Sequence, residues 1–218
     1  LTPVPLTSFT PLGQFIIMLM MQIGGLGIIT MTLMVIASLT RTGLSTQIIA
    51  SQILEIERYS DIKKLLITII TFTLGVELVG AGLLFYTIKD LFPLKTAIFY
   101  AAFHSISAFC NAGFSIFPSD LAAMHLNQNL AFLSIAGALM LIGGLGFITW
   151  HEIIHFKNQK QHKLSLNSQL VLMMVTILIA TFTILFFILE HDNALCEYSL
   201  WQQFYNAIFN AIAMRRWV

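Results

Sequence analysis

Long apolar stretches separated by short polar segments dominate the chain. Four of them are long enough to cross a bilayer as a helix, which takes about 20 residues: residues 12–39, 65–88, 130–150 and 166–189. Two further apolar segments, 96–109 and 200–214, are shorter. At about 1.5 Å of rise per residue each reaches only about 20 Å, so we interpret them as re-entrant half-helices that enter the membrane without crossing it.

An eight-residue motif occurs twice in these stretches. Residues 23–30 read Ile-Gly-Gly-Leu-Gly-Ile-Ile-Thr, and 119 residues later 142–149 read Ile-Gly-Gly-Leu-Gly-Phe-Ile-Thr. The glycines of the two copies are Gly24, Gly25, Gly27, Gly143, Gly144 and Gly146. They favour either close packing of helices through small residues or a hinge in an inner span. The repeat indicates an internally duplicated membrane protein, a class that usually moves solutes.

The distribution of Lys and Arg predicts the orientation. The 41–64 and 151–167 loops are basic, whereas the opposite loops mix Lys89 and Lys95 with acidic residues or carry acidic residues alone. Basic loops stay in the cytoplasm, so both glycine-bearing spans run inward and the repeats are parallel. We therefore predict an all-α integral membrane protein built from parallel repeats of span, re-entrant pore helix, filter loop and span.

Composition agrees with this class, because 57% of residues are hydrophobic and only 10% are charged, against about 25% charged in soluble domains. A net charge of +1 without a basic run argues against a nucleic-acid partner. Cys110 and Cys196, the only cysteines, lack metal-ligand spacing. The start and the end of the sequence lead us to expect a fragment.

The segment after the first half-helix carries the candidate chemistry. A helix ending at Phe109 presents partly negative carbonyls at its C-terminus, which favours a cation. The small residues that follow, with a glycine for unusual backbone angles, predict an extended strand whose carbonyls replace an ion's hydration shell. They are Cys110, Asn111, Ala112 and Gly113. No acidic residue lies between 96 and 118, which suits a monovalent ion. The structural alternative is a re-entrant loop that only packs.

These residues resemble the second pore loop of the Trk/Ktr/HKT potassium transporter superfamily, above all its bacterial KtrB and TrkH subunits. The resemblance rests on Phe103-His104-Ser105-Ile106-Ser107-Ala108-Phe109, on the following Cys110-Asn111-Ala112-Gly113-Phe114-Ser115, and on both glycine motifs. It implies potassium coordination by the carbonyls of Cys110, Asn111, Ala112 and Gly113. The filter would be supported by Phe103, Ser107, Phe109 and Phe114, with glycine-bearing inner helices below.

The resemblance also implies an organisation and partners. Four pore units would surround one pore, and this chain would hold the end of the first (1–44), a complete second (45–158) and an incomplete third (159–218) that lacks its filter. Such a chain is not expected to conduct alone. The intact protein would be a homodimer in the bacterial inner membrane and would bind a cytoplasmic, nucleotide-binding regulatory subunit of the KtrA/TrkA kind. Potassium would be the transported ligand, with no organic cofactor and no enzymatic activity.

Two other functions compete with this interpretation. His151-Glu152-Ile153-Ile154-His155 matches the zinc-protease pattern and raises an intramembrane metalloprotease as an alternative. No aspartate lies inside a predicted span to supply a third ligand. The other alternative is a non-conducting remnant or assembly subunit.

Two polar residues inside the apolar segments have a structural and a functional interpretation. An intramembrane carboxylate such as Glu77 is a functional candidate by default, but we favour a hydrogen bond to a neighbouring half-helix, away from the ion path. For His104 we expect a buried, hydrogen-bonded histidine and not a metal ligand. The amphipathic stretch 45–60 predicts either a solvated helix end or a docking surface for a cytoplasmic partner.

Overall fold

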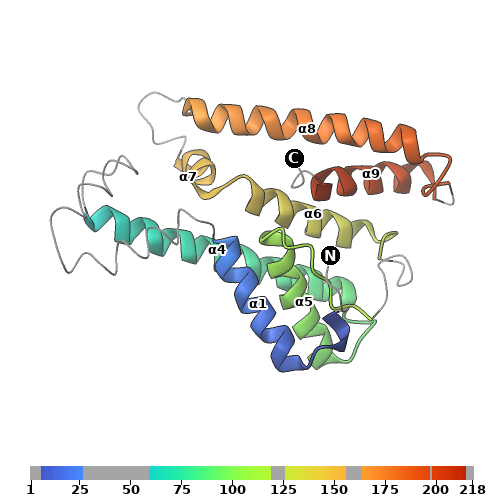
Figure 1. Cartoon of the computed structure of the whole chain (residues 1–218), viewed down its shortest axis with the longest axis horizontal. Coiled ribbons are helices and arrows are strands. Elements are labelled where there is room, and N and C mark those ends of the chain that lie inside the picture. The colour runs from blue at the N-terminus through green and yellow to red at the C-terminus, as the bar shows by residue number, and fades with distance from the viewer. Residues whose placement is uncertain (1–5, 27–58, 119–125, 156–163, 197, 215–218) are drawn as a thin grey trace.

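The computed structural model describes residues 6–26, 59–118, 126–155, 164–196 and 198–214. Every regular element in these ranges is a helix (Figure 1). The elements are η1 (Leu6–Ser8), α1 (Pro11–Gly25), α4 (Tyr59–Ile88), α5 (Leu94–Phe109), α6 (Leu130–Gly144), α7 (Phe147–His155), α8 (Leu166–Glu190) and α9 (Leu200–Met214). The all-α prediction is therefore confirmed for the described part of the chain.

Most predicted elements are found where the apolar pattern placed them. Helices α4 and α8 coincide with two predicted spans, and α5 and α9 with the two short segments. The stretch 130–150 differs, because α6 stops at Gly144 and α7 begins at Phe147, with Gly146 between them at a φ of +79°. The expectations for 27–39 and for most of 45–60 lie outside the described residues.

Helices α1 and α6 repeat each other in length and in capping. Both contain 15 residues, and both end at the second glycine of their copy of the motif, Gly25 and Gly144. The Thr10 hydroxyl accepts the amide of Gly13 at the start of α1, and the Asn129 side chain accepts the amide of Phe132 at the start of α6. The local structure thus follows the 119-residue sequence repeat even where the side chains differ.

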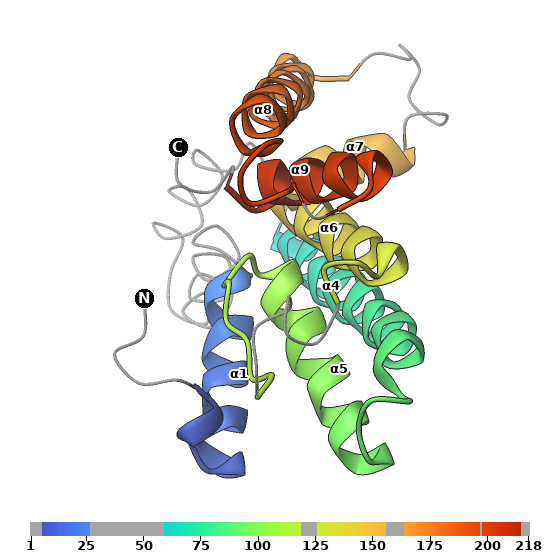
Figure 2. The ribbon, with the colours of Figure 1, turned by 90° about the vertical axis from the view of Figure 1, so that its right-hand side faces the viewer.

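The packing of the helices is also repeated. Helix α4 packs against α5 as α8 packs against α9, and α1 packs against α5 as α6 packs against α9. Helix α6 in addition contacts α4 and α5, so it lies between the two groups of helices (Figures 1 and 2). The turn after α5 therefore has glycine-bearing helices on two sides.

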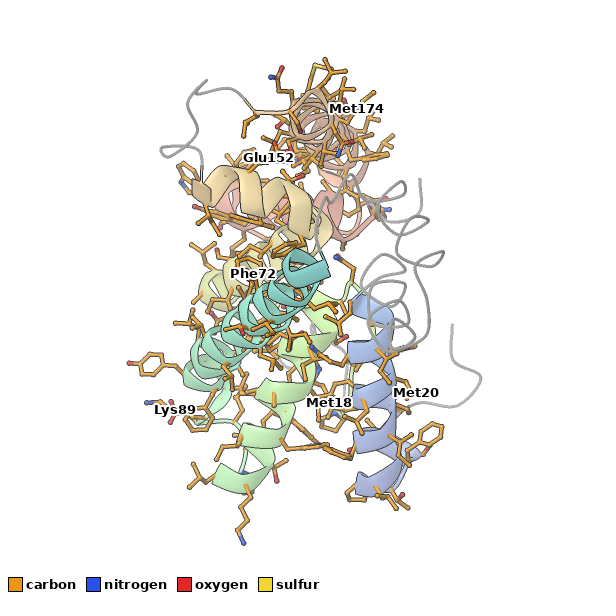
Figure 3. All side chains as sticks on the ribbon, turned by 90° about the vertical axis from the view of Figure 1, so that its left-hand side faces the viewer. Met18, Met20, Phe72, Lys89, Glu152 and Met174 are labelled. Atoms are coloured by element: carbon orange, nitrogen blue, oxygen red, sulfur yellow. The ribbon has the colours of Figure 1, made fainter. Side chains whose placement is uncertain are left out.

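Burial along α8 is reversed relative to a helix of a water-soluble protein. Its buried residues are the polar Ser168 and Thr183, whereas Met174, Ile177 and Leu189 are more than half exposed. Figure 3 shows the side chain of Met174 at the outer surface of this helix. Helix α8 and the segment Leu66–Ile88 of α4 are long and apolar enough to cross a membrane. An apolar exterior of this extent fits a lipid environment.

The buried interior joins α4, α5 and α6 through one cluster and α1 with α5 through a second. The first includes Leu84, Ala101 and Leu139, and the second includes Leu6, Met21 and Phe103. Met18 of α1 borders the second cluster, whereas Met20 is 68% exposed (Figure 3). The C-terminal half of α5 is thereby enclosed by α1, α4 and α6.

Candidate functional site

Helix α5 ends in a tight turn. The amide of Asn111 donates to the carbonyl of Ala108 (3.0 Å) and the amide of Ala112 donates to that of Ser107 (2.8 Å). This pair of bonds, with a left-handed residue at Asn111 (φ +49°), is a Schellman motif. The expected extended strand is therefore wrong for Cys110 and Asn111. The carbonyls of Ser107 and Ala108 are also occupied by the turn, so fewer helix-end carbonyls face a ligand than the sequence suggested.

The side chain of Asn111 fixes the turn to α6. Its amide nitrogen donates to the carbonyl of Met140 at 3.2 Å. Asparagine tolerates left-handed backbone angles better than most residues, which explains its presence where glycine is the usual choice. Gly113, at φ +70°, is the second residue of the turn with a positive φ.

Ser107 holds both ends of this loop. Its carbonyl accepts the amide of Ala112, while its hydroxyl donates to the carbonyl of Phe114 at 2.7 Å and accepts the amide of Phe114 at 3.0 Å. One nearly buried serine thus fixes the backbone on either side of Gly113. We call residues 110–113, held in this way, the clamped loop.

Two glycines from different copies of the repeat pack against the clamped loop. A methyl group on Gly25 of α1 would overlap the side chain of Cys110, and one on Gly143 of α6 would overlap the carbonyl oxygen of Phe109. The close-packing interpretation is confirmed for these two glycines. A methyl group on Gly24 would meet none of the atoms that the structure describes within 4 Å. Gly27 lies outside the described residues.

Three of the four predicted supporting residues are buried, and the fourth, Phe114, is half-buried. Phe103 and Phe109 are buried at 0% and 7% exposure, and Ser107 at 4%. The clamped loop itself is partly exposed, since Cys110, Asn111 and Ala112 are half-buried and Gly113 is exposed. The backbone after α5 is therefore fixed by a buried scaffold while the loop remains accessible.

His104 supports the segment that follows the loop. Its Nδ1 lies 2.7 Å from the Tyr100 carbonyl, so Nδ1 carries the proton, and Nε2 lies 3.1 Å from the Ser115 hydroxyl. The ring stacks on Phe117 with centroids 3.8 Å apart. The expected hydrogen-bonded histidine is confirmed.

Glu77 is 4% exposed and bonds to two other helices. Its Oε2 accepts the side-chain amide of Gln22 of α1 at 2.8 Å, and its backbone carbonyl accepts the Ser105 hydroxyl of α5 at 2.7 Å. The bond to the half-helix α5 is thus made by the backbone of Glu77 and not by its carboxyl, which bonds to α1, so the predicted carboxyl bond to the half-helix is wrong in its partner. Gln22 precedes the first glycine motif, so Glu77 also contacts the glycine-bearing helix α1. Gln22 was missed, although an amide side chain in an apolar helix was a visible signal; α1 contains two, Gln14 and Gln22.

The break between α6 and α7 is held by Trp150, a second residue whose role was not predicted from the sequence. Its indole nitrogen donates to the carbonyl of Ile142 at 2.8 Å, one of the C-terminal carbonyls of α6 without a helical partner. Phe72 of α4, which Figure 3 labels, packs against Trp150 and against Phe147. The bend therefore has its own hydrogen bond and aromatic support.

The zinc-protease pattern lies on α7, where the side chains of His151 and His155 are outside the described residues. Glu152, labelled in Figure 3, accepts the backbone amide of Ser165, just before α8, at 2.9 Å. The glutamate of the pattern thus helps to fix the start of α8. Among the described residues, no group of three or more His, Cys, Asp or Glu side chains could hold a metal ion.

Comparison with known proteins identifies relatives along nearly the whole sequence. The family model described as TrkH, cation transport protein, matches residues 3–216. The chain is 31% identical over 205 residues to the potassium/sodium uptake protein NtpJ of Enterococcus hirae, covering 93% of this chain and 45% of that protein. It is 36% identical over 186 residues to the Ktr system potassium uptake protein B of Vibrio alginolyticus, covering 85% and 40%.

A third relative is the Ktr system potassium uptake protein B of Bacillus subtilis, 31% identical over 188 residues, with 86% of this chain and 41% of that protein covered. The chain spans less than half the length of each of these relatives.

Proposed function

Because the chain belongs to the TrkH family of cation transport proteins, we propose that it supplies part of a potassium uptake path across a bacterial inner membrane. The relatives named as potassium uptake proteins support potassium as the ion. The family is a cation transporter, so the metalloprotease alternative is not favoured.

The proposed ion site is the clamped loop. In this proposal the backbone carbonyls of Cys110, Asn111, Ala112 and Gly113 coordinate a dehydrated potassium ion and line one quarter of a pore. The observation that carries this proposal is that three contacts meet at this one short loop. They are the hydrogen bonds of Ser107, the packing of Gly25 on Cys110 and the packing of Gly143 on the Phe109 carbonyl. A filter needs carbonyls held in fixed positions, and a loop fixed from three sides while still accessible meets that need.

The proposed architecture extends the observed repeats. Residues 45–158 form a complete pore unit in which α4 spans the membrane, α5 is the re-entrant pore helix and α6 is the inner span. Residues 1–44 end the preceding unit, and 159–218 begin the next. Two observations support this division. Helices α1 and α6 have the same length and end at equivalent glycines, and the packing of α4 on α5 is repeated by that of α8 on α9.

The proposed partners follow from the family and not from contacts in this chain. Relatives are named as parts of a Ktr system, which supports assembly with other components. We propose a homodimer of the intact protein with a cytoplasmic nucleotide-binding regulatory subunit.

The test uses a chimera in which this chain replaces the matching segment of the Vibrio alginolyticus protein, expressed in a host that cannot take up potassium. The chimera is expected to restore growth at low potassium, and Gly113→Ala is expected to abolish it. A methyl group on Gly113 would touch no part of the described chain within 4 Å, so the expected effect comes from the φ of +70°, which costs about 1–2 kcal/mol for a residue with a side chain.

Gly82→Ala is the matched control, because Gly82 also has open space around it but lies within helix α4. Equal growth of the Gly113→Ala and Gly82→Ala chimeras at normal expression would contradict the proposed ion site. Growth supported by this chain without the rest of the chimera would contradict the expectation that it does not conduct alone.

A further inference from the structure

Two acceptor oxygens are left without partners where α1 meets α4. The amide nitrogen of Gln22 donates to Oε2 of Glu77. Within the described part of the chain, the buried atoms Oε1 of Glu77 and Oε1 of Gln22 have no hydrogen-bond partner. Buried polar atoms of this kind are rare and call for an explanation. Both groups are acceptors, so neither oxygen can satisfy the other as long as the carboxyl is ionised.

A single proton on Glu77 would supply the donor that both oxygens lack. A proton on Oε1 of Glu77 makes that atom a donor to Oε1 of Gln22, while the existing bond from the Gln22 nitrogen to Oε2 remains. The acid and the amide then form a closed pair with two hydrogen bonds and no net charge. An ionised carboxylate at this depth in a membrane protein would instead need a cation or further donors.

No charged side chain among the described residues is positioned to take the place of that proton. Helices α1 and α6 contain no Asp, Glu, Lys, Arg or His. The Lys89 ammonium lies over the Tyr86 ring at the far end of α4, about 18 Å of helix away from Glu77.

Helix α5 carries the titratable residues Lys95, Tyr100 and His104. Lys95 precedes Ser105 by about 15 Å of helix. The two ring nitrogens of His104 are directed to Tyr100 and Ser115, and Tyr100 packs in the aromatic cluster with Phe92 and Phe117.

We propose that Glu77 and Gln22 share one bound proton, and that this neutral pair holds α1 against the clamped loop. Gln22 lies one helical turn before Gly25, which packs directly on the Cys110 side chain. When the proton leaves to solvent, the pair keeps one hydrogen bond and gains a buried negative charge. Helix α1 then loosens at Gly25, and Cys110 becomes more accessible.

The second copy of the repeat lacks this device. Leu141 occupies the position equivalent to Gln22, and α8 has no ionisable residue before Glu190. Of the two copies, the proton site therefore belongs to the α1–α4 contact. The substitution Gln22→Leu gives the first copy the residue that the second copy has at the equivalent position.

The direct test is infrared spectroscopy of the full chain in lipid, titrated with acid and base. The carbonyl stretch of a protonated carboxyl is expected at neutral pH, absent from Glu77→Gln and lost reversibly in the unsubstituted chain as the pH rises. If no such band depends on Glu77 at neutral pH, or if a carboxylate band responds to added sodium instead, the proposal fails.

The second test measures the position of α1 through its neighbour. Alkylation of Cys110 is compared with that of the exposed Cys196 in the same chain. The Cys110/Cys196 ratio is expected to rise with pH in the unsubstituted chain and to stay low in Glu77→Gln, because a glutamine at 77 forms both hydrogen bonds without a proton. Gln22→Leu should raise the ratio at all pH values by at least about fivefold. This factor corresponds to the smallest usual free-energy cost of leaving one buried polar group without a hydrogen bond.

Gln169→Leu is the matched control, since the exposed side chain of Gln169 in α8 donates to the Leu164 carbonyl at the start of its own helix, away from α1 and α4 in the sequence. A pH-independent ratio in the unsubstituted chain, or a Glu77→Gln variant as reactive as Gln22→Leu, would overturn the positioning role. Neither measurement depends on transport, so a failure here is distinct from a failure of the proposed potassium path.

Discussion

Gly143 of α6 lies directly against the carbonyl oxygen of Phe109, the last residue of α5. A side chain of any size at this position would overlap that oxygen. At the equivalent glycine of the first copy, Gly24, a methyl group would meet no atom of the described residues within 4 Å. The same motif therefore serves different contacts in its two copies, and the pair gives a direct experimental comparison.

Gly143→Ala is expected to destabilise the protein and Gly24→Ala is not. Alanine in a helix interior normally stabilises by roughly 0.5–1 kcal/mol relative to glycine, and Gly24→Ala should show that gain or no change. At Gly143 the methyl group must displace the end of α5, with a cost of about 1–3 kcal/mol. Thermal unfolding in detergent measures both, and an equal response would show that α6 does not approach Phe109 this closely.

Ser107→Ala is expected to release the clamped loop. It removes the two bonds between the Ser107 hydroxyl and the backbone of Phe114, which leaves part-buried polar groups unpaired at a cost of about 1–3 kcal/mol. In the chimera, the ratio of rubidium uptake to sodium uptake should fall even where the amount of expressed protein is unchanged. Thr176→Ala removes a hydroxyl bonded only within its own helix and serves as control. Unchanged ion discrimination in Ser107→Ala would show that the clamp does not govern selectivity.

Substitutions of Asn111 separate its backbone angle from its side-chain bond. Both Asn111→Gly and Asn111→Ala lose the bond to the Met140 carbonyl, but only alanine pays the strain of a φ of +49°, about 1 kcal/mol or more. Uptake by the chimera should therefore fall further in Asn111→Ala than in Asn111→Gly. The reverse order would mean that the left-handed turn is not required.

Trp150→Phe is expected to loosen the break between α6 and α7. Phenylalanine keeps an aromatic ring beside Phe72 but leaves the carbonyl of Ile142 without its donor. Hydrogen exchange of the amides of 147–155 should become faster, by about fivefold for a loss near 1 kcal/mol. Trp201→Phe, at a 73% exposed position, should leave these amides unchanged. Equal exchange in both variants would show that the indole bond does not hold the bend.

Much of the architecture was predictable because apolar length and periodicity determine helices in a membrane protein. The limits of α4, α8, α5 and α9 follow the apolar stretches to within a few residues of most ends. The glycine motif had suggested a hinge in the inner span as one interpretation, but the apolar run through Trp150 did not locate the break after Gly144 or the positive φ of Gly146. The bond that stabilises the break comes from eight residues away and has no local signature.

The candidate loop was located from its sequence, but its conformation was not. Cys110 and Asn111 are compatible with an extended strand and with a helix-ending turn, and the choice depends on Ser107 and Met140, whose contacts are set by the tertiary structure. The coordination of potassium by this loop stays a prediction. That Glu77 and His104 form hydrogen bonds was predictable, since buried polar groups need partners. That Gln22 is the partner of the Glu77 carboxyl was not, because it depends on the packing of α1 on α4.

The reversed burial of α8 has a practical consequence for anyone who handles the protein. Because the leucines, isoleucines and methionines of this helix point outward while Ser168 and Thr183 point inward, water is a poor solvent for the folded form. Extraction without a micelle or nanodisc around this helix should give precipitate, and the choice of detergent will govern yield more than salt or temperature will.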